Sequence, residues 1–68
     1  MRRKLLNTYE FTEDLTISEV LEFSDVIGEP VYEYYANDEF VFGAEDRFTL
    51  DMLENLYMQG FFDDFYLT

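Results

Sequence analysis

The sequence predicts an α+β fold: a four-stranded antiparallel sheet with two helices on one of its faces. Three observations support this prediction. Several segments are rich in the β-favouring residues Tyr, Phe, Val and Thr, two others carry apolar residues at helical spacing, and an internal repeat relates the two halves of the chain.

The first two predicted elements are a strand and a helix. Residues 5–11, LLNTYEF, mix apolar and polar positions in a β-favouring stretch, which predicts a strand. Residues 12–30 predict a helix, because Thr16 and Glu19 have the spacing of a capping box and Gly28 offers a left-handed exit. One face of that helix would carry Ile17, Val20, Leu21, Ser24 and Ile27.

A β-hairpin is predicted next, over residues 31–42. Two runs rich in Val, Tyr and Phe lie on either side of Asn37 and Asp38, two residue types that tolerate tight-turn geometry.

A second helix and a final strand complete the prediction. Thr49 is a suitable N-cap and Gly60 a suitable end for a helix between them. Asp51 would lie in its first turn, and one face would carry Leu50, Leu53, Leu56 and Tyr57. The tail FFDDFYL, residues 61–67, predicts a last strand.

The repeat relates positions 32 residues apart. Glu13, Asp14, Leu21, Glu22, Gly28 and Tyr34 match the identical residues Glu45, Asp46, Leu53, Glu54, Gly60 and Tyr66. Two β-α-β halves give the order β-α-β-β-α-β of the ferredoxin-like arrangement, which leaves the second sheet face open. We expect some of the fourteen aromatic residues to be exposed on that face or on an edge. A sheet with a single docked helix is the alternative.

Length and composition indicate one folded domain over residues 1–68, in which residues 1–4 form a basic segment outside the first predicted strand. The hydrophobic content of 49% is too high for a typical disordered chain. The chain has no Cys and no His, so disulfides and the usual zinc ligands are excluded. Since no apolar run suits a membrane span or a signal peptide, we expect a cytoplasmic protein.

Acidity is the strongest functional signal. Sixteen Asp and Glu face four Lys and Arg, a net charge of −12, and beyond residue 4 the only basic residue is Arg47. A surface of this charge disfavours direct binding to nucleic acid or to an anionic membrane, and it favours a cationic protein partner.

The sequence carries no motif for catalysis, a metal or a cofactor. Adjacent acids are expected by chance at this composition, and nucleophile and base pairs, phosphate-binding glycine loops and calcium loops are missing. We therefore expect neither an enzyme nor a cofactor.

The candidate site is a partner-binding acidic surface. We expect it to include acids on the outer sides of both helices, on the hairpin and on the tail, together with two hairpin tyrosines as anchors. These residues are Glu19, Glu22, Asp25, Glu33, Asp38, Glu39, Asp51, Glu54, Asp63, Asp64, Tyr34 and Tyr35.

In size, acidity, lack of Cys and His and abundance of Tyr and Phe, the chain resembles the small DNA-mimic inhibitors of phages and mobile elements. These include anti-CRISPR proteins, anti-restriction proteins and inhibitors of uracil-DNA glycosylase. The resemblance implies a phage inhibitor acting in the host cytoplasm, whose carboxylates replace phosphates in the basic groove of a nuclease, CRISPR effector or glycosylase. A small homodimeric interaction module, acidic for solubility only, is the alternative.

Overall fold

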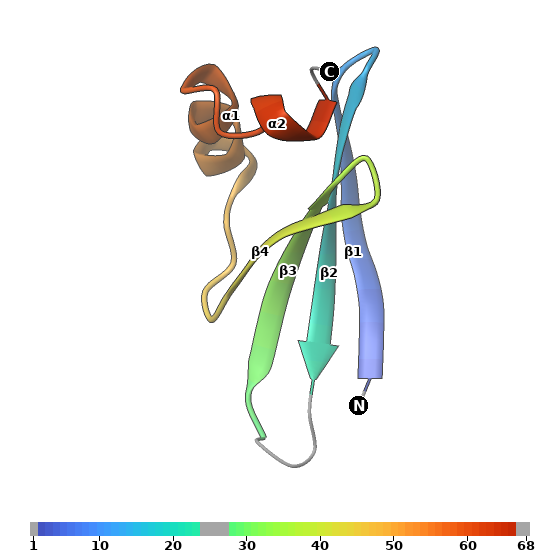
Figure 1. The fold of residues 1–68 in the computed structure, drawn as a ribbon. Coiled ribbons are helices and arrows are strands. Elements are labelled where there is room, and N and C mark those ends of the chain that lie inside the picture. Colours follow the sequence, from blue (N-terminus) through green and yellow to red (C-terminus); the bar gives the residue numbers. More distant parts are fainter. Residues whose placement is uncertain (1, 24–27, 67–68) are drawn as a thin grey trace.

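The computed structural model describes residues 2–23 and 28–66, which form an antiparallel sheet followed by two short helices (Figure 1). Each strand pairs antiparallel with the next, in the spatial order β1-β2-β3-β4. The α+β class and the four-stranded antiparallel sheet are confirmed. The elements are β1 (Arg2–Thr12), β2 (Leu15–Phe23), β3 (Pro30–Ala36), β4 (Glu39–Ala44), α1 (Leu50–Met58) and α2 (Asp63–Tyr66).

The predicted helix over residues 12–30 is wrong, because β2 occupies most of it and pairs with β1 on one side and β3 on the other. Leu15, Ile17 and Glu19 are buried on one face, and the residues between them point to the other face, which is the period of a strand. Glu19 hides this alternation in the sequence, since a carboxylate stands where a strand pattern requires an apolar residue. The predicted helical positions Ser24 and Ile27 lie outside the described residues.

The ferredoxin-like order β-α-β-β-α-β is therefore not adopted. The repeat has no structural counterpart either, because it aligns Leu21 of β2 with Leu53 of α1. Arg2 to Lys4, which the sequence pattern left outside the first strand, belong to β1.

The predicted hairpin is confirmed as β3 and β4. Asn37 and Asp38 form its two-residue turn with φ values of 49° and 68°, the positive values that a type I′ turn requires at both positions. Asn37 also fixes the hairpin to the start of β2, since its backbone N–H donates to the Thr16 carbonyl oxygen over 2.9 Å.

The predicted second helix is confirmed as α1. The Thr49 hydroxyl oxygen accepts a hydrogen bond from the Met52 backbone N–H over 3.3 Å, as an N-cap does. Leu53 is buried on the inner side of the helix, and Leu56 and Tyr57 are half-buried beside it.

The predicted final strand is wrong, because the tail turns back at Gly60 and forms α2. Gly60 has a φ of 83°, and the backbone N–H of Phe61 donates to the Leu56 carbonyl oxygen, which ends α1 and redirects the chain. Phe62 and Phe65 then pack against the core, an i, i+3 spacing that suits a helical turn and brings both rings inward.

The core lies between one face of the sheet and the helical segment. Its buried members are Leu15, Ile17, Tyr34, Ala36, Leu53 and Phe62. The molecule is elongated, with extents of 37 × 19 × 17 Å, and the helices lie toward one end of it, beside the turn between β1 and β2 (Figure 1). Toward the other end, Leu21 and Phe23 line an open groove and are not covered by a helix.

Candidate functional site

Two hairpin turns bring four carboxylates together near the helical end of the sheet. The Asn37 side-chain amide donates to the Asp14 carbonyl oxygen over 2.7 Å, so the turn between β3 and β4 lies against the turn between β1 and β2. All four acidic side chains on these turns are exposed. They are Glu13, Asp14, Asp38 and Glu39.

The helices add further carboxylates to the same end. Asp51, Glu54 and Asp64 are exposed, and Asp63 is half-buried with its carboxylate accepting a hydrogen bond from the Tyr66 hydroxyl over 3.4 Å. We call these acids and those of the two turns the acidic end. Its described residues include no Lys or Arg, and none of its carboxylates forms an ion pair with a described residue.

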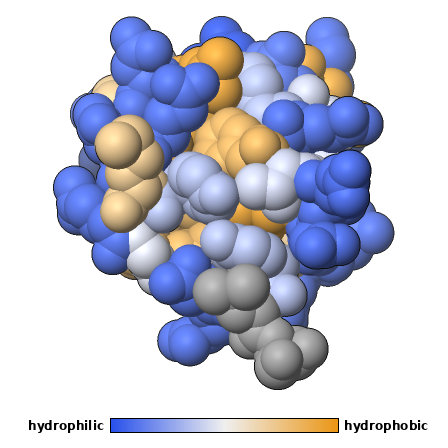
Figure 2. All heavy atoms as spheres, turned by 90° about the horizontal axis from the view of Figure 1, so that it is seen from above, coloured by the Kyte–Doolittle hydropathy of each residue, from blue (hydrophilic) through white to orange (hydrophobic). Residues whose placement is uncertain are grey.

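Apolar side chains are exposed among these acids. Met58 is 82% exposed, Phe61 46% and Met52 43%, and Phe40 is 51% exposed close to the turn between β3 and β4. Seen from above the helices, an apolar area lies in the middle of this end and hydrophilic residues surround it (Figure 2). Partly exposed apolar groups inside a charged rim are the composition of a protein-binding surface.

A groove of about 310 Å³ crosses the boundary between β1 and α1. Phe11, Tyr57 and Met58 form its apolar lining, and Glu10 and Glu54 are the acidic residues that line it. The rings of Phe11 and Tyr57 lie edge to face, 5.5 Å apart between centroids, and so give the groove a packed aromatic wall.

Glu19 and Tyr34, two of the predicted surface residues, are fully buried. The Tyr34 hydroxyl donates to Glu19 Oε2 over 2.6 Å and accepts from the Phe48 backbone N–H over 2.7 Å. The amide of Asn7 donates to Glu19 Oε1 over 2.9 Å, and the guanidinium of Arg47 forms an ion pair with it at 3.0 Å. Neither predicted residue can contact a partner, because both belong to the interior.

Two opposing effects set the protonation of this network. Burial alone would raise the pKa of Glu19, but the hydrogen bonds from Arg47, Tyr34 and Asn7 together outweigh it and hold the pKa below its ordinary value. Burial, followed by the hydrogen bond to Glu19, raises the pKa of the Tyr34 hydroxyl. Glu19 is therefore a charged group inside the fold whose role is structural.

Glu22, Glu33 and Tyr35 lie together on the opposite, open face of the sheet, as expected for residues one or three positions from buried Glu19 or Tyr34. Arg3 joins them, with its guanidinium 3.1 Å from Glu33 and 3.8 Å from Glu22, and it also donates to the Tyr35 hydroxyl. The hydrogen bond with Glu33, followed by burial, raises the pKa of Glu22, although Arg3 acts in the other direction. These acids are half-buried and partly neutralised, so they contribute less to an acidic surface than their number implies.

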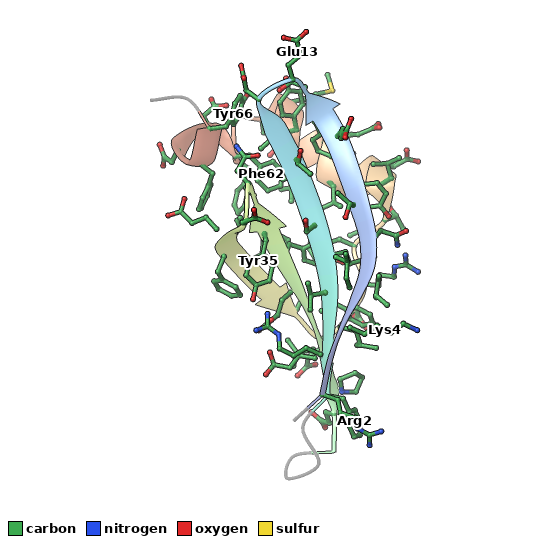
Figure 3. The ribbon with its side chains drawn as sticks, turned by 90° about the vertical axis from the view of Figure 1, so that its right-hand side faces the viewer. Arg2, Lys4, Glu13, Tyr35, Phe62 and Tyr66 are labelled. Atoms are coloured by element: carbon green, nitrogen blue, oxygen red, sulfur yellow. The ribbon has the colours of Figure 1, made fainter. Side chains whose placement is uncertain are left out.

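The basic residues of β1 lie far from the turn between β1 and β2 (Figure 3). Arg2 and Lys4 lie near one end and Glu13 lies at the other. At the first end, a groove of about 570 Å³ is lined by Arg2, Arg3, Lys4, Leu21 and Phe23. We call this the basic end.

The structure thus retains six of the twelve predicted site residues on one end of the molecule: Asp38, Glu39, Asp51, Glu54, Asp63 and Asp64. Asp25 lies outside the described residues. Sequence reasoning missed the acids of the turn between β1 and β2, because that turn was included in the predicted helical segment. It also missed Met58 and Phe61, whose signal was their position beside the helix-ending Gly60.

Within residues 2–23 and 28–66, no three carboxylates converge in a way that could hold a metal ion. In the same described part of the chain, neither helix has the length and apolar character needed to cross a membrane.

Comparisons with known proteins gave no match: no family model matches the sequence, and neither a curated protein nor a solved structure is significantly similar to the chain.

Proposed function

We propose that the chain is a protein inhibitor that binds the positively charged nucleic-acid groove of a host enzyme through its acidic end. The observation that carries this proposal is the combination of carboxylates and exposed apolar side chains at that end. Carboxylates without ion-pair partners among the described residues surround exposed apolar side chains, at an end whose described residues include no cation.

The acids have an electrostatic role in this proposal. A basic groove that binds nucleic acid neutralises phosphates spaced along a backbone, and unpaired carboxylates at the acidic end offer the same charge. Asp38 and Glu39 suit this role best, because a tight turn projects them and no described residue neutralises them. Long-range attraction would steer the encounter and make the affinity depend steeply on salt.

The exposed apolar residues have a second role. Charge alone gives loose binding to many cationic surfaces, whereas apolar anchors that fill pockets give a single docked geometry. Met58 and Phe61 provide such anchors beside Asp64 and Glu54. Tyr34, an anchor in the sequence-based hypothesis, is replaced in this role by these residues.

The class of target follows from charge and from the resemblance in composition. The protein would act in host cytoplasm as an anti-defence protein of the anti-CRISPR or anti-restriction type, on a nuclease, CRISPR effector or glycosylase. It would need neither catalysis nor a cofactor, since occupying the groove is sufficient.

The test is capture of the target from host-cell lysate at low salt on the immobilised chain, followed by elution with rising salt. We expect one nucleic-acid-binding enzyme to be retained, to be released by salt and to be displaced by duplex DNA or RNA. A captured partner that ignores both salt and nucleic acid would contradict the proposal and favour an interaction module whose acidity serves solubility.

A further inference from the structure

The outer edge of β1 is an unused pairing surface. β1 is eleven residues long and pairs only with β2. Among the described residues, no backbone hydrogen bond reaches its other side. A strand edge of this length is a template for pairing with another strand.

The two ends of β1 carry charges of opposite sign. Arg2, Arg3 and Lys4 open the strand, and Glu10 lies near its close, just before the acidic turn. In an antiparallel pair of two copies, the basic start of each strand lies against the acidic close of the other, whereas parallel pairing would place like charges together. The order of charges along the strand is therefore complementary to that of an antiparallel copy.

The edge also escapes the repulsion expected between two acidic proteins. β1 carries three cations and one carboxylate, a net charge of +2, in a chain whose net charge is −12. Pairing through β1 thus brings together the one element that is not acidic, while the strongly acidic turn between β3 and β4 lies at the other edge of the sheet.

The bulge in β1 restricts the registers of such a pair. The register with β2 shifts between Leu5 and Asn7, so Lys4, Asn7 and Tyr9 share the sheet face that carries the core. A two-fold axis between residues 6 and 7 keeps paired residues on the same face, and it places Lys4 of one copy opposite Tyr9 of the other on the core face and Arg3 opposite Glu10 on the open face.

The groove between β1 and α1 lies at the place where this register puts Lys4. It is lined by Glu10, Phe11, Glu54, Tyr57 and Met58. An aromatic wall beside the acidic Glu54 suits a lysine, whose apolar stem contacts the rings while its ammonium group reaches the carboxylate. Lys4 is exposed and has no ion pair or hydrogen bond with any residue in the described part of its own chain.

We propose that two copies of the chain form a symmetric dimer by antiparallel pairing of their β1 edges, with Lys4 of each copy in the groove beside Glu54 of the other. The partner is a second copy because edge, charge order and groove are all present on one chain and are related by a single two-fold axis. This dimer does not depend on the proposed inhibitor function, and it leaves the turn that carries Asp38 and Glu39 free.

Sedimentation equilibrium of the full chain over a wide concentration range tests the dimer. We expect a monomer and dimer equilibrium that Lys4→Glu and Glu54→Lys each weaken at least about tenfold, because each change removes two symmetry-related charge contacts from the dimer. The double variant, in which the two charges are exchanged, should return to within about threefold of the original dissociation constant.

Glu45→Lys is the matched control, since it makes the same change in net charge as Glu54→Lys at an exposed site outside β1 and α1. It should leave the dimer unchanged or slightly tighter. Circular dichroism confirms that each variant is folded, as expected at exposed positions. A chain that stays monomeric up to millimolar concentration would overturn the proposal, and so would single variants that behave like Glu45→Lys or a double variant that is not restored.

Discussion

The two faces of the sheet each bring together a glutamate, a tyrosine and an arginine, and the two clusters differ in burial. On the covered face, Glu19 and Tyr34 have no exposed surface and Arg47 closes the network from a loop. The Glu19 carboxylate accepts hydrogen bonds from Tyr34, Arg47 and Asn7. No buried polar side-chain atom in the described part of the chain lacks a hydrogen-bond partner.

On the open face, Arg3 holds two carboxylates, Glu22 and Glu33, whose side chains are 21% and 18% exposed, against 0% for Glu19. The arginines do not differ, since the side chains of Arg3 and Arg47 are 52% and 51% exposed. Solvent screens these pairs, and the two acids repel each other beside one cation. The same residue types are therefore a structural requirement on one face and a nearly neutral surface feature on the other. The comparison teaches that burial, and not residue pattern, decides what a carboxylate contributes here.

The largest expected effect comes from Arg47→Met. A carboxylate left unpaired inside a fold costs about 3–5 kcal/mol, and Glu19 would be such a group. A domain of this length is stable by roughly 3–10 kcal/mol, so we expect the urea midpoint to fall by about a third or more. The same change on the open face, Arg3→Met, should shift the midpoint far less. Equal shifts in both variants would contradict the difference between the faces.

A smaller difference is expected between two adjacent tyrosines. Tyr34→Phe removes a hydroxyl that donates to Glu19 and accepts from the Phe48 backbone N–H, and buried groups that lose such partners cost about 1–3 kcal/mol. Tyr35→Phe, on the open face, should stay within about 0.5 kcal/mol of the original. Thermal or urea unfolding of the two variants measures the difference, and a Tyr35 effect as large as that of Tyr34 would contradict it.

The smallest expected effect is a difference between the two faces in how the stability of the protein depends on pH. The pKa of Glu19 is lowered by folding, so its stabilisation is present above its unfolded value of about 4.3 and is lost as the pH falls through the lower folded value. The pKa of Glu22 is raised, so its charge disfavours the folded state at neutral pH and this cost disappears in acid.

Glu19→Gln should therefore destabilise the protein at pH 7 and approach the original only when the pH falls below the lowered folded pKa of Glu19, where the original carboxyl also becomes protonated. Glu22→Gln should be neutral or slightly stabilising at pH 7. Urea midpoints at a series of pH values give both differences. A loss of stability in Glu22→Gln equal to that in Glu19→Gln would show that the two carboxylates are equivalent.

Local signals in the sequence were sufficient for the hairpin and for α1. Asn37 and Asp38 require no distant residue to form their turn, and Thr49 and Gly60 bound a helix by short-range hydrogen bonding. These elements, and the exposed acids that they carry, were predicted correctly.

The signals that failed depended on distant partners. Glu19 is tolerated in the middle of β2 because Arg47, 28 residues later, neutralises it, and no local pattern contains that pairing. Tyr34 is tolerated inside the fold for a similar reason, because its hydroxyl has hydrogen-bond partners on Glu19 and Phe48, which are distant in the sequence. The tail was predicted as a strand from its aromatics, but the reversal at Gly60 places Phe62 in the core, where packing decides the conformation.

The central claim is that particular carboxylates at the acidic end, and not net charge alone, bind the target. Two triple variants with the same net charge of −9, which is −12 raised by three, separate these possibilities. One carries Asp38→Asn, Glu39→Gln and Asp64→Asn at the acidic end. The other carries Glu29→Gln, Glu45→Gln and Asp46→Asn at exposed loop positions outside it.

The deciding measurement is the dissociation constant of each variant for the captured enzyme at one fixed salt concentration. We predict a loss of about 100-fold for the first variant, because three charged contacts at about 1 kcal/mol each multiply to that factor, and less than about threefold for the second. Equal losses in the two variants, or no loss in the first, would contradict the claim that the acidic end is the binding surface.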